Sequence, residues 1–170
     1  MERLYPDIIE VLGRQHDRKS FSCGNPALDQ YLKTLARQHG LNRVSRTYVA
    51  CKDQTIMGYY SLAMSAIRKE NLPGKYLGRY PDYPLPVARL ARLAVDQRFQ
   101  RQGLGQLLLS DALSRCLKVS DVLGMIGVIV DAKDNKARQW YERFEFEQFV
   151  DAPLTLWIPV TALEYLQEML

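Results

Sequence analysis

The chain has 170 residues, of which 47% are hydrophobic and 25% charged, and its formal net charge is +4. This ordinary globular composition suits one compact domain over residues 1–170 and is short for two. No stretch approaches the roughly 18 uninterrupted apolar residues of a membrane span, and the N-terminus lacks the basic start and apolar run of a secretory signal. We therefore expect a cytoplasmic protein without a membrane partner.

Strand-like and helix-like segments alternate along the chain. Pro26 suits the first turn of a helix in which Leu28, Tyr31 and Leu32 recur at helical spacing. Prolines and glycines gathered between 69 and 88 oppose a regular helix or central strand and favour a loop or short turns of helix. In chain order we predict strand 8–12, helix 26–39, strands 47–52 and 56–66, loop 69–88, strand 89–95, helix 104–118, strand 125–131, helix 135–144, and strands 146–150 and 154–158. This order is typical of a mixed, mainly antiparallel sheet flanked by helices.

The cysteines and histidines indicate neither a metal site nor a nucleophilic site. Cys23, Cys51 and Cys116 are odd in number and widely spaced, which suits reduced thiols in a reducing compartment. We expect His16 and His39, the only histidines, at the surface, because polar side chains are generally exposed. We predict no bound metal and no Ser-His or Cys-His catalytic pair.

The most informative segment is a turn with two glycines, Gly103 and Gly105, between the predicted strand 89–95 and helix 104–118. The first amides of a helix have no partner inside the helix and carry the positive end of its dipole, and glycine lets a phosphate approach them closely. The segment is not a P-loop, because no Lys-Ser/Thr follows the second glycine, and it lacks the third glycine of the dinucleotide fingerprint. Two interpretations stay open on the residues alone: a diphosphate-binding site, or a turn that needs glycine only for its backbone angles.

Two separated motifs resemble those of the GCN5-related N-acetyltransferases, the GNAT family. The first, Leu-Ala-Val-Asp at 93–96 followed by Gln-Arg-Gln-Gly-Leu-Gly at 100–105, is similar to the family's strand ending in Val-Asp and its Arg/Gln-x-x-Gly-x-Gly/Ala turn. The second, at 134–146, is similar to Asn-x-x-Ala-x-x-Phe-Tyr-Glu-x-x-Gly-Phe, with Asp134 in place of the asparagine and Glu145 in place of the glycine.

The GNAT resemblance covers roughly residues 45–160. It implies an α/β (α+β) fold with a mixed, mainly antiparallel central sheet of about six to seven strands flanked by about four helices. It also implies that the protein transfers acetyl from acetyl-CoA and uses no metal.

The resemblance makes Tyr141 the catalytic residue, which protonates the departing thiolate. A phenol has an ordinary pKa near 10, close to that of a thiol, and so can give up a proton as charge develops on sulfur. Periodicity alone favours a core aromatic of an amphipathic helix. We name no general base. The cofactor-binding residues that the resemblance implies are Leu93, Ala94, Val95, Gln100, Arg101, Gln102, Gly103, Leu104, Gly105, Gln106, Asp134, Ala137 and Tyr141.

A narrower resemblance spans nearly the whole chain. Segments 21–32, 45–50, 58–62 and 85–96 are similar to the acetyltransferase toxins of bacterial toxin–antitoxin modules. This resemblance implies transfer of acetyl to the α-amino group of aminoacyl-tRNA, which blocks translation. The implied partners are aminoacyl-tRNA, a DNA-binding antitoxin of the ribbon-helix-helix type, and a second copy of the chain in a homodimer.

Basic residues, interleaved with tyrosines, cluster in and around the 69–88 loop. Arginine and lysine can contact phosphates, and tyrosine can stack on the exposed bases of a single-stranded end. Without the toxin resemblance, an ordinary soluble surface explains these residues equally well. The tRNA-binding residues that we predict are Arg43, Arg46, Lys75, Arg79, Arg89 and Arg92.

Three functions are compatible with the sequence. The first is a toxin that acetylates aminoacyl-tRNA. The second is an acetyltransferase for a protein N-terminus or a small-molecule amine, which needs the cofactor site but not the basic residues. The third is a non-catalytic acetyl-CoA-binding module, against which Tyr141 argues. The sequence does not identify the aminoacyl-tRNA.

Overall fold

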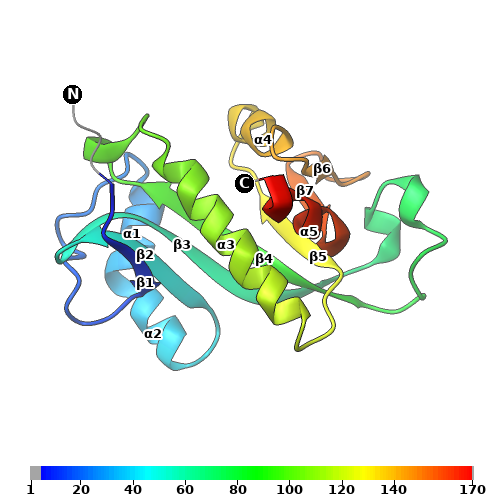
Figure 1. Ribbon diagram of the computed structural model, residues 1–170, viewed down its shortest axis with the longest axis horizontal. Coiled ribbons are helices and arrows are strands. Elements are labelled where there is room, and N and C mark those ends of the chain that lie inside the picture. The colour runs from blue at the N-terminus through cyan, green and yellow to red at the C-terminus, as the bar shows by residue number, and fades with distance from the viewer. Residues whose placement is uncertain (1–4, 170) are drawn as a thin grey trace. The chain divides into compact units, whose positions relative to one another are not determined.

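The computed structural model describes residues 5–169, and within them it contains seven strands and five α-helices (Figure 1). The strands are β1 (Ile8–Val11), β2 (Arg46–Lys52), β3 (Thr55–Ile67), β4 (Leu85–Val95), β5 (Gly127–Asp131), β6 (Glu147–Gln148) and β7 (Thr155–Pro159). The α-helices are α1 (Pro26–Thr34), α2 (Ala36–Leu41), α3 (Leu104–Ser120), α4 (Asn135–Glu142) and α5 (Val160–Met169). Short 3₁₀ turns are η1 (Lys69–Asn71), η2 (Gly74–Tyr76) and η3 (Gln97–Phe99).

The strands form one mixed sheet in the order β1-β2-β3-β4-β5-β7-β6. β4 and β5 pair in parallel, whereas β1–β2, β2–β3, β5–β7 and β6–β7 pair antiparallel. The predicted α/β fold with a mixed, mainly antiparallel sheet is confirmed. The parallel register runs from Val87 opposite Gly127 to Leu90 opposite Val130, so residues 91–95 of β4 lie beyond the segment that pairs with β5.

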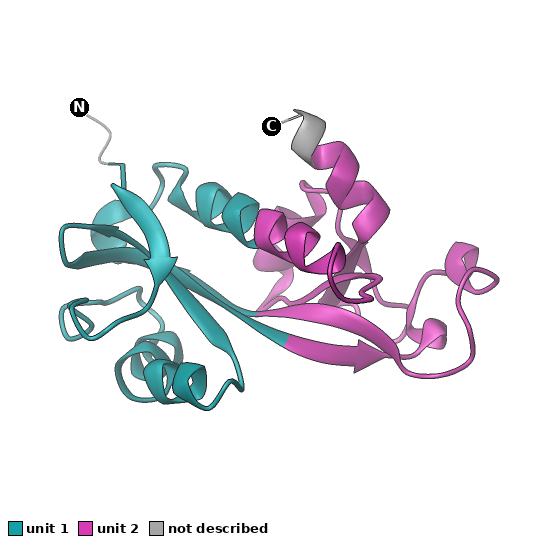
Figure 2. Ribbon diagram, turned by 60° about the horizontal axis from the view of Figure 1, so that its bottom comes forward, with its two compact units in different colours: residues 1–63, 91–112 teal, residues 64–90, 113–170 magenta. Residues whose placement is uncertain are grey.

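The chain divides into two compact units, each of two segments (Figure 2). The first unit contains the residues up to 63 together with 91–112, and the second contains 64–90 together with those from 113 onward. β3, β4 and α3 each begin in one unit and end in the other. The single domain expected from the sequence stays a prediction.

The core of the first unit forms where α1 packs on β2 and β3. Leu32 of α1, Val49 of β2 and Tyr59 of β3 are each fully buried in one cluster. The rings of Phe21 and Tyr59 meet edge to face with centroids 5.5 Å apart, and the Tyr59 hydroxyl donates to the carbonyl of Leu28 at 2.8 Å. Burying each such side chain contributes about 1.5–3 kcal/mol to stability.

The core of the second unit is built around Trp157 of β7, which is fully buried with Val87 of β4 and Ile129 of β5. Tyr76 of η2 packs edge to face on Trp157 at 4.9 Å between centroids. Its hydroxyl donates to Glu147 Oε1 at 2.6 Å. The loop that contains η1 and η2 is therefore anchored to the core at Tyr76.

Several predicted elements differ in extent from the structure, and two of these differences have a clear physical reason. The helix predicted over 26–39 is two helices, because the backbone breaks at Leu35, where φ is −117°. The strand predicted to begin at 89 begins at Leu85 and includes Pro86. Proline lacks an N–H but keeps its acceptor, and the Pro86 carbonyl accepts from the Ile126 amide at 2.9 Å. The remaining segment, 69–84, was predicted to be a loop or short turns of helix, and it is a loop that contains the 3₁₀ turns η1 and η2.

The described residues contain five α-helices where about four were predicted. The additional helix is α5, which directly follows β7 without an intervening turn. Among the residues described, no helix is long and apolar enough to cross a membrane.

Candidate active site

The glycine turn lies between η3 and α3 in the first unit. Arg101 and Gly103 both have left-handed backbones, with φ of 63° and 86°. An L side chain in this region costs roughly 1–2 kcal/mol, which accounts for glycine at 103. A Cβ built on Gly103 would have no heavy atom within 4 Å, so the space beside this backbone is open to a ligand. Because the helix amides that follow need partners from outside the helix, the turn has the features of an anion site.

Asp96 holds the start of this turn in place. Its buried carboxylate accepts hydrogen bonds from the backbone amides of Ser22 and Arg98 at 3.1 and 2.9 Å, and from the Arg98 guanidinium at 2.9 and 3.2 Å. Burial raises the pKa of Asp96, but the hydrogen bonds from Arg98 and Ser22 outweigh it and hold the pKa below the usual value of 3.8.

Gln100 has a role that the sequence did not indicate. Its side-chain amide donates to the carbonyl of Val95 at 2.8 Å and to that of Cys23 at 3.0 Å. The side chain thus ties the turn to the end of β4. A contribution of Gln100 to cofactor binding stays a prediction, and it would come from the backbone position that this side chain fixes.

The end of β4 packs closely on β3 inside the first unit. A Cβ built on Gly58 would lie 3.0 Å from the Ala94 carbonyl and 2.8 Å from a methyl of Leu108, so only glycine fits there without a shift. The Asp96 amide also donates to the Met57 carbonyl at 2.9 Å. These contacts fix the backbone of the segment 93–95, which is predicted to bind the cofactor.

The second motif forms α4 in the second unit. Asp134 is its N-cap, and its carboxylate accepts from the Ala137 amide at 2.8 Å. Tyr141 is buried and packs edge to face against Trp140 and Phe146, with centroids 5.0 and 5.5 Å apart. Burial raises the pKa of Tyr141 to about 12, so the phenol keeps its proton at neutral pH. Tyr141 is therefore a core aromatic whose phenol stays protonated, and its role as the proton donor stays a prediction.

Glu145 takes the backbone conformation that its usual glycine would provide. Its φ is 71°, and the Phe144 and Glu145 amides donate to Tyr141 and Glu142 carbonyls at 2.9 and 3.2 Å. The tight turn after α4 is therefore present despite the departure from the motif, at the cost of a strained residue.

Several of the predicted tRNA-binding side chains already have partners within the protein. Lys75 Nζ lies 2.9 Å from Glu147 Oε2, Arg89 forms an ion pair with Asp131, and the Arg92 guanidinium lies 3.5 Å from the centroid of the Tyr31 ring. The remaining three also differ in setting: Arg79 lies over the ring of Tyr76, and Arg43 and Arg46 are exposed.

Asp131 was missing from the predicted site residues. It directly follows the buried segment Gly127–Val130 at the end of β5. Its carboxylate accepts from Arg89 Nη1 and, at 2.9 Å, from the hydroxyl of Thr155. A charged residue at the end of a buried apolar run is visible in the sequence, and it makes Asp131 a further candidate for the site.

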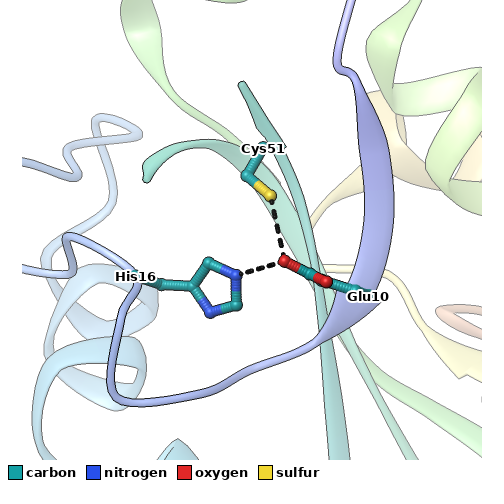
Figure 3. A group of neighbouring side chains, drawn as sticks. All are labelled: Glu10, His16 and Cys51. Atoms are coloured by element: carbon teal, nitrogen blue, oxygen red, sulfur yellow. Dashed lines mark hydrogen bonds and ion pairs between the residues drawn. The ribbon is translucent and has the colours of Figure 1, made fainter. Parts of the chain in front are cut away.

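The prediction that His16 lies at the surface is wrong: its side chain is buried. Figure 3 shows its ring beside Glu10 and Cys51, whose ligand atoms lie within 4.8 Å of one another. His16 Nδ1 accepts from the Gly13 amide at 2.9 Å, so in the neutral ring the proton is on Nε2, which donates to Glu10 Oε1 at 2.9 Å. Both ring nitrogens of His16 therefore have hydrogen-bond partners within the protein, and the absence of a bound metal stays a prediction.

Comparison with known proteins agrees with this geometry. Residues 43–148 match the model of the acetyltransferase (GNAT) domain. A tRNA-acetylating toxin of Mycobacterium tuberculosis is 40% identical over 140 residues, which cover 82% of this chain and 84% of the toxin. The structure of AtaT complexed with acetyl-methionyl-tRNAfMet superposes with a TM-score of 0.89 at 29% identity, covering 94% of this chain and 98% of that one. A mutant AtaT toxin bound to the C-terminus of the antitoxin AtaR and acetyl-CoA has a TM-score of 0.80 at 28% identity, covering 94% and 96%.

The mixed sheet and the match of residues 43–148 define an acyltransferase that uses a CoA thioester. The chain belongs to the GCN5-related N-acetyltransferase family. It is an acetyl-CoA-dependent N-acetyltransferase.

Proposed function

We propose that this acetyltransferase is the toxin of a toxin–antitoxin pair, and that it acetylates the α-amino group of aminoacyl-tRNA and so blocks translation. The observation that carries this proposal is the 40% identity to a tRNA-acetylating toxin over 82% of the chain. This similarity extends well outside the cofactor motifs, into segments that a shared cofactor alone does not explain.

Acetyl-CoA fits the first unit as its cosubstrate. The open space at Gly103 and the amides that begin α3 suit the diphosphate, and the segment 93–95 suits the pantetheine arm. Leu93, Ala94 and Val95 would contact that arm through their backbone, and Asp134 would act by fixing the first turn of α4.

Acetyl transfer from the thioester to the amine needs one proton donor from the protein. The neutral α-amine attacks the thioester carbonyl, a C–N bond forms and the C–S bond breaks. The Tyr141 phenol gives its proton to the departing thiolate, the amine gives one to water, and Tyr141 regains a proton from solvent. The raised pKa of Tyr141, about 12, keeps the acid loaded at every physiological pH. The amine of an aminoacyl ester is partly neutral near pH 7, so the step needs no side chain as a general base.

Arg43 and Arg46 are the strongest candidates for contact with tRNA phosphates, because both are exposed. Lys75, Arg79, Arg89 and Arg92 remain in the proposed surface, but each already contacts a carboxylate or a ring. This internal pairing favours the second candidate, an acetyltransferase for a protein N-terminus or a small-molecule amine.

The proposal includes the partners of such a toxin: aminoacyl-tRNA, an antitoxin of the ribbon-helix-helix type, and a second copy in a homodimer. Structures of AtaT with acetyl-methionyl-tRNAfMet and with the C-terminus of AtaR support the first two classes of partner. We place the reaction in the cytoplasm, where charged tRNA is found. We also propose that catalysis uses no metal, in keeping with the chemistry above.

The test incubates the protein with labelled acetyl-CoA and, separately, with charged tRNA, uncharged tRNA, spermidine and short peptides. Label is expected only on charged tRNA, at an alkali-labile aminoacyl position. Transfer to peptides or polyamines without transfer to charged tRNA would replace the toxin by the second candidate. Charge reversal of Arg43 and Arg46 together should weaken tRNA binding and flatten its salt dependence while acetyl-CoA affinity is unchanged.

A further inference from the structure

A cavity of about 440 Å³ lies in the second unit, and its lining includes none of the residues predicted to hold the cofactor diphosphate. Its size suits one small molecule or one chemical group rather than a helix or a strand. Both apolar and charged side chains line it, among them Ile67, Arg68, Arg89, Asp131, Phe149 and Thr155.

The two kinds of side chain have different exposure. Ile67 and Phe149 are buried and supply an apolar wall. Arg68 is open to solvent, with 78% of its side chain exposed, and its Nε lies 3.8 Å from Glu70 Oε2. The cavity therefore combines an apolar wall with a guanidinium that is open to an anion.

Asp131 is the acceptor of this cavity, and two neighbours fix its orientation. Oδ2 accepts from Arg89 and Oδ1 accepts from Thr155. A carboxylate offers about four lone-pair sites, so each oxygen can accept one hydrogen bond more. Since 56% of the Asp131 side chain is exposed, that remaining capacity is open to a ligand.

We propose that this cavity receives the aminoacyl group of charged tRNA, and that Asp131 accepts a hydrogen bond from its α-amino group. This inference rests on the proposed function. An aminoacyl ester has the chemistry that the lining complements: an N–H donor for the carboxylate, a side chain for the apolar wall, and the phosphate of the terminal nucleotide for Arg68. Asp131 is then a substrate-positioning residue.

The same lining selects against basic amino acids. Arg68 and Arg89 repel a second positive charge in so small a space, and Asp131 already forms an ion pair with Arg89. Glu70, which contacts Arg68, does not line the cavity. We expect tRNA charged with uncharged amino acids to be acetylated at least tenfold faster than tRNA charged with lysine or arginine.

The test measures binding, without acetyl-CoA, of charged tRNA and of the same tRNA chemically N-acetylated. The wild type should bind the free amine at least tenfold more tightly than the acetylated form. Asp131→Asn should lower this ratio to below about threefold, and Thr155→Val, which frees one side of the carboxylate, should give an intermediate ratio. Asp121→Asn, an exposed aspartate of the same unit outside the cavity, should keep the wild-type ratio.

The outcomes separate the two proposals. Unchanged acetyl-CoA affinity of Asp131→Asn reports that the variant is folded. If the wild type labels charged tRNA but Asp131→Asn keeps the full preference for the free amine, the cavity does not hold the α-amine and this inference fails alone. If the wild type labels no charged tRNA, the proposed function itself fails.

Discussion

Asp96 and Arg98 form a closed pair at the start of the glycine turn: the carboxylate accepts from both the backbone amide and the guanidinium of Arg98. The folded-state pKa of Asp96 is therefore below 3.8. A group whose pKa is lowered on folding stabilises the fold above its unfolded-state pKa, and this stability is lost as pH falls through the folded-state value. The pair thus links acid stability to the shape of the turn.

Replacing Asp96 with asparagine tests this link. Because charge-assisted hydrogen bonds contribute about 1.5–3 kcal/mol, Asp96→Asn should lower the free energy of unfolding at pH 7 by about that amount. The difference from wild type should shrink as pH falls below 4, where the wild-type carboxylate is also being protonated. Urea unfolding at pH 7 and at pH 3 measures both values. An equal difference at the two pH values would contradict the assignment.

Gly103 should be essential for cofactor affinity rather than for folding. Gly103→Ala places a methyl in the open space proposed for the diphosphate and adds roughly 1–2 kcal/mol of backbone strain. We expect at least a tenfold loss of acetyl-CoA affinity by calorimetry, with the circular dichroism of a folded protein. Gly124→Ala is the matched control, since a Cβ there also meets no atom within 4 Å, and it should bind normally.

Tyr141→Phe should separate chemistry from binding. The ring still packs against Trp140 and Phe146, but the proton is gone, so turnover should fall by roughly 10²-fold with acetyl-CoA affinity unchanged. With a pKa of about 12, the wild-type phenol should remain an acid throughout the range from pH 7 to 10. If the wild-type kcat declined between pH 7 and 10 and the decline were absent in Tyr141→Phe, the pKa of Tyr141 would lie below 12.

The turn after α4 offers a stabilising substitution. Glu145→Gly relieves the left-handed strain at 145 but gives the unfolded chain more freedom, for an expected net gain of about 0.5–1 kcal/mol. Gln139→Gly, inside α4, should instead lose about 1 kcal/mol. Thermal unfolding should show a higher midpoint for Glu145→Gly and a lower one for Gln139→Gly. A loss of stability in Glu145→Gly would mean that the Glu145 side chain stabilises the fold by more than the backbone strain costs.

Elements with strong local signals were predictable from the sequence. Pro26 lies in the first turn of α1 as expected, and the side chain of the preceding Asn25 caps the helix by accepting from the Ala27 and Leu28 amides. The glycine turn was also predictable, because its backbone angles and its position before a helix both require particular residues.

Features that depend on tertiary contact were not predictable. His16 is polar, yet it is buried because Glu10 and the Gly13 amide satisfy its ring. Pro86 can lie inside a strand because its carbonyl still accepts a hydrogen bond from the Ile126 amide. Arg89 was predicted to bind phosphate, but its ion pair with Asp131 depends on strand register, which a single sequence does not reveal.

Three elements, β3, β4 and α3, run without interruption from one compact unit into the other. A strand or helix holds its hydrogen bonds cooperatively, so one part of it cannot open without weakening the part that follows. We therefore expect slowly exchanging amides of β3 and β4 to share a single opening free energy, equal to that of global unfolding. Denaturant should then reveal one transition rather than two, and a protease should find no intermediate in which either unit alone survives.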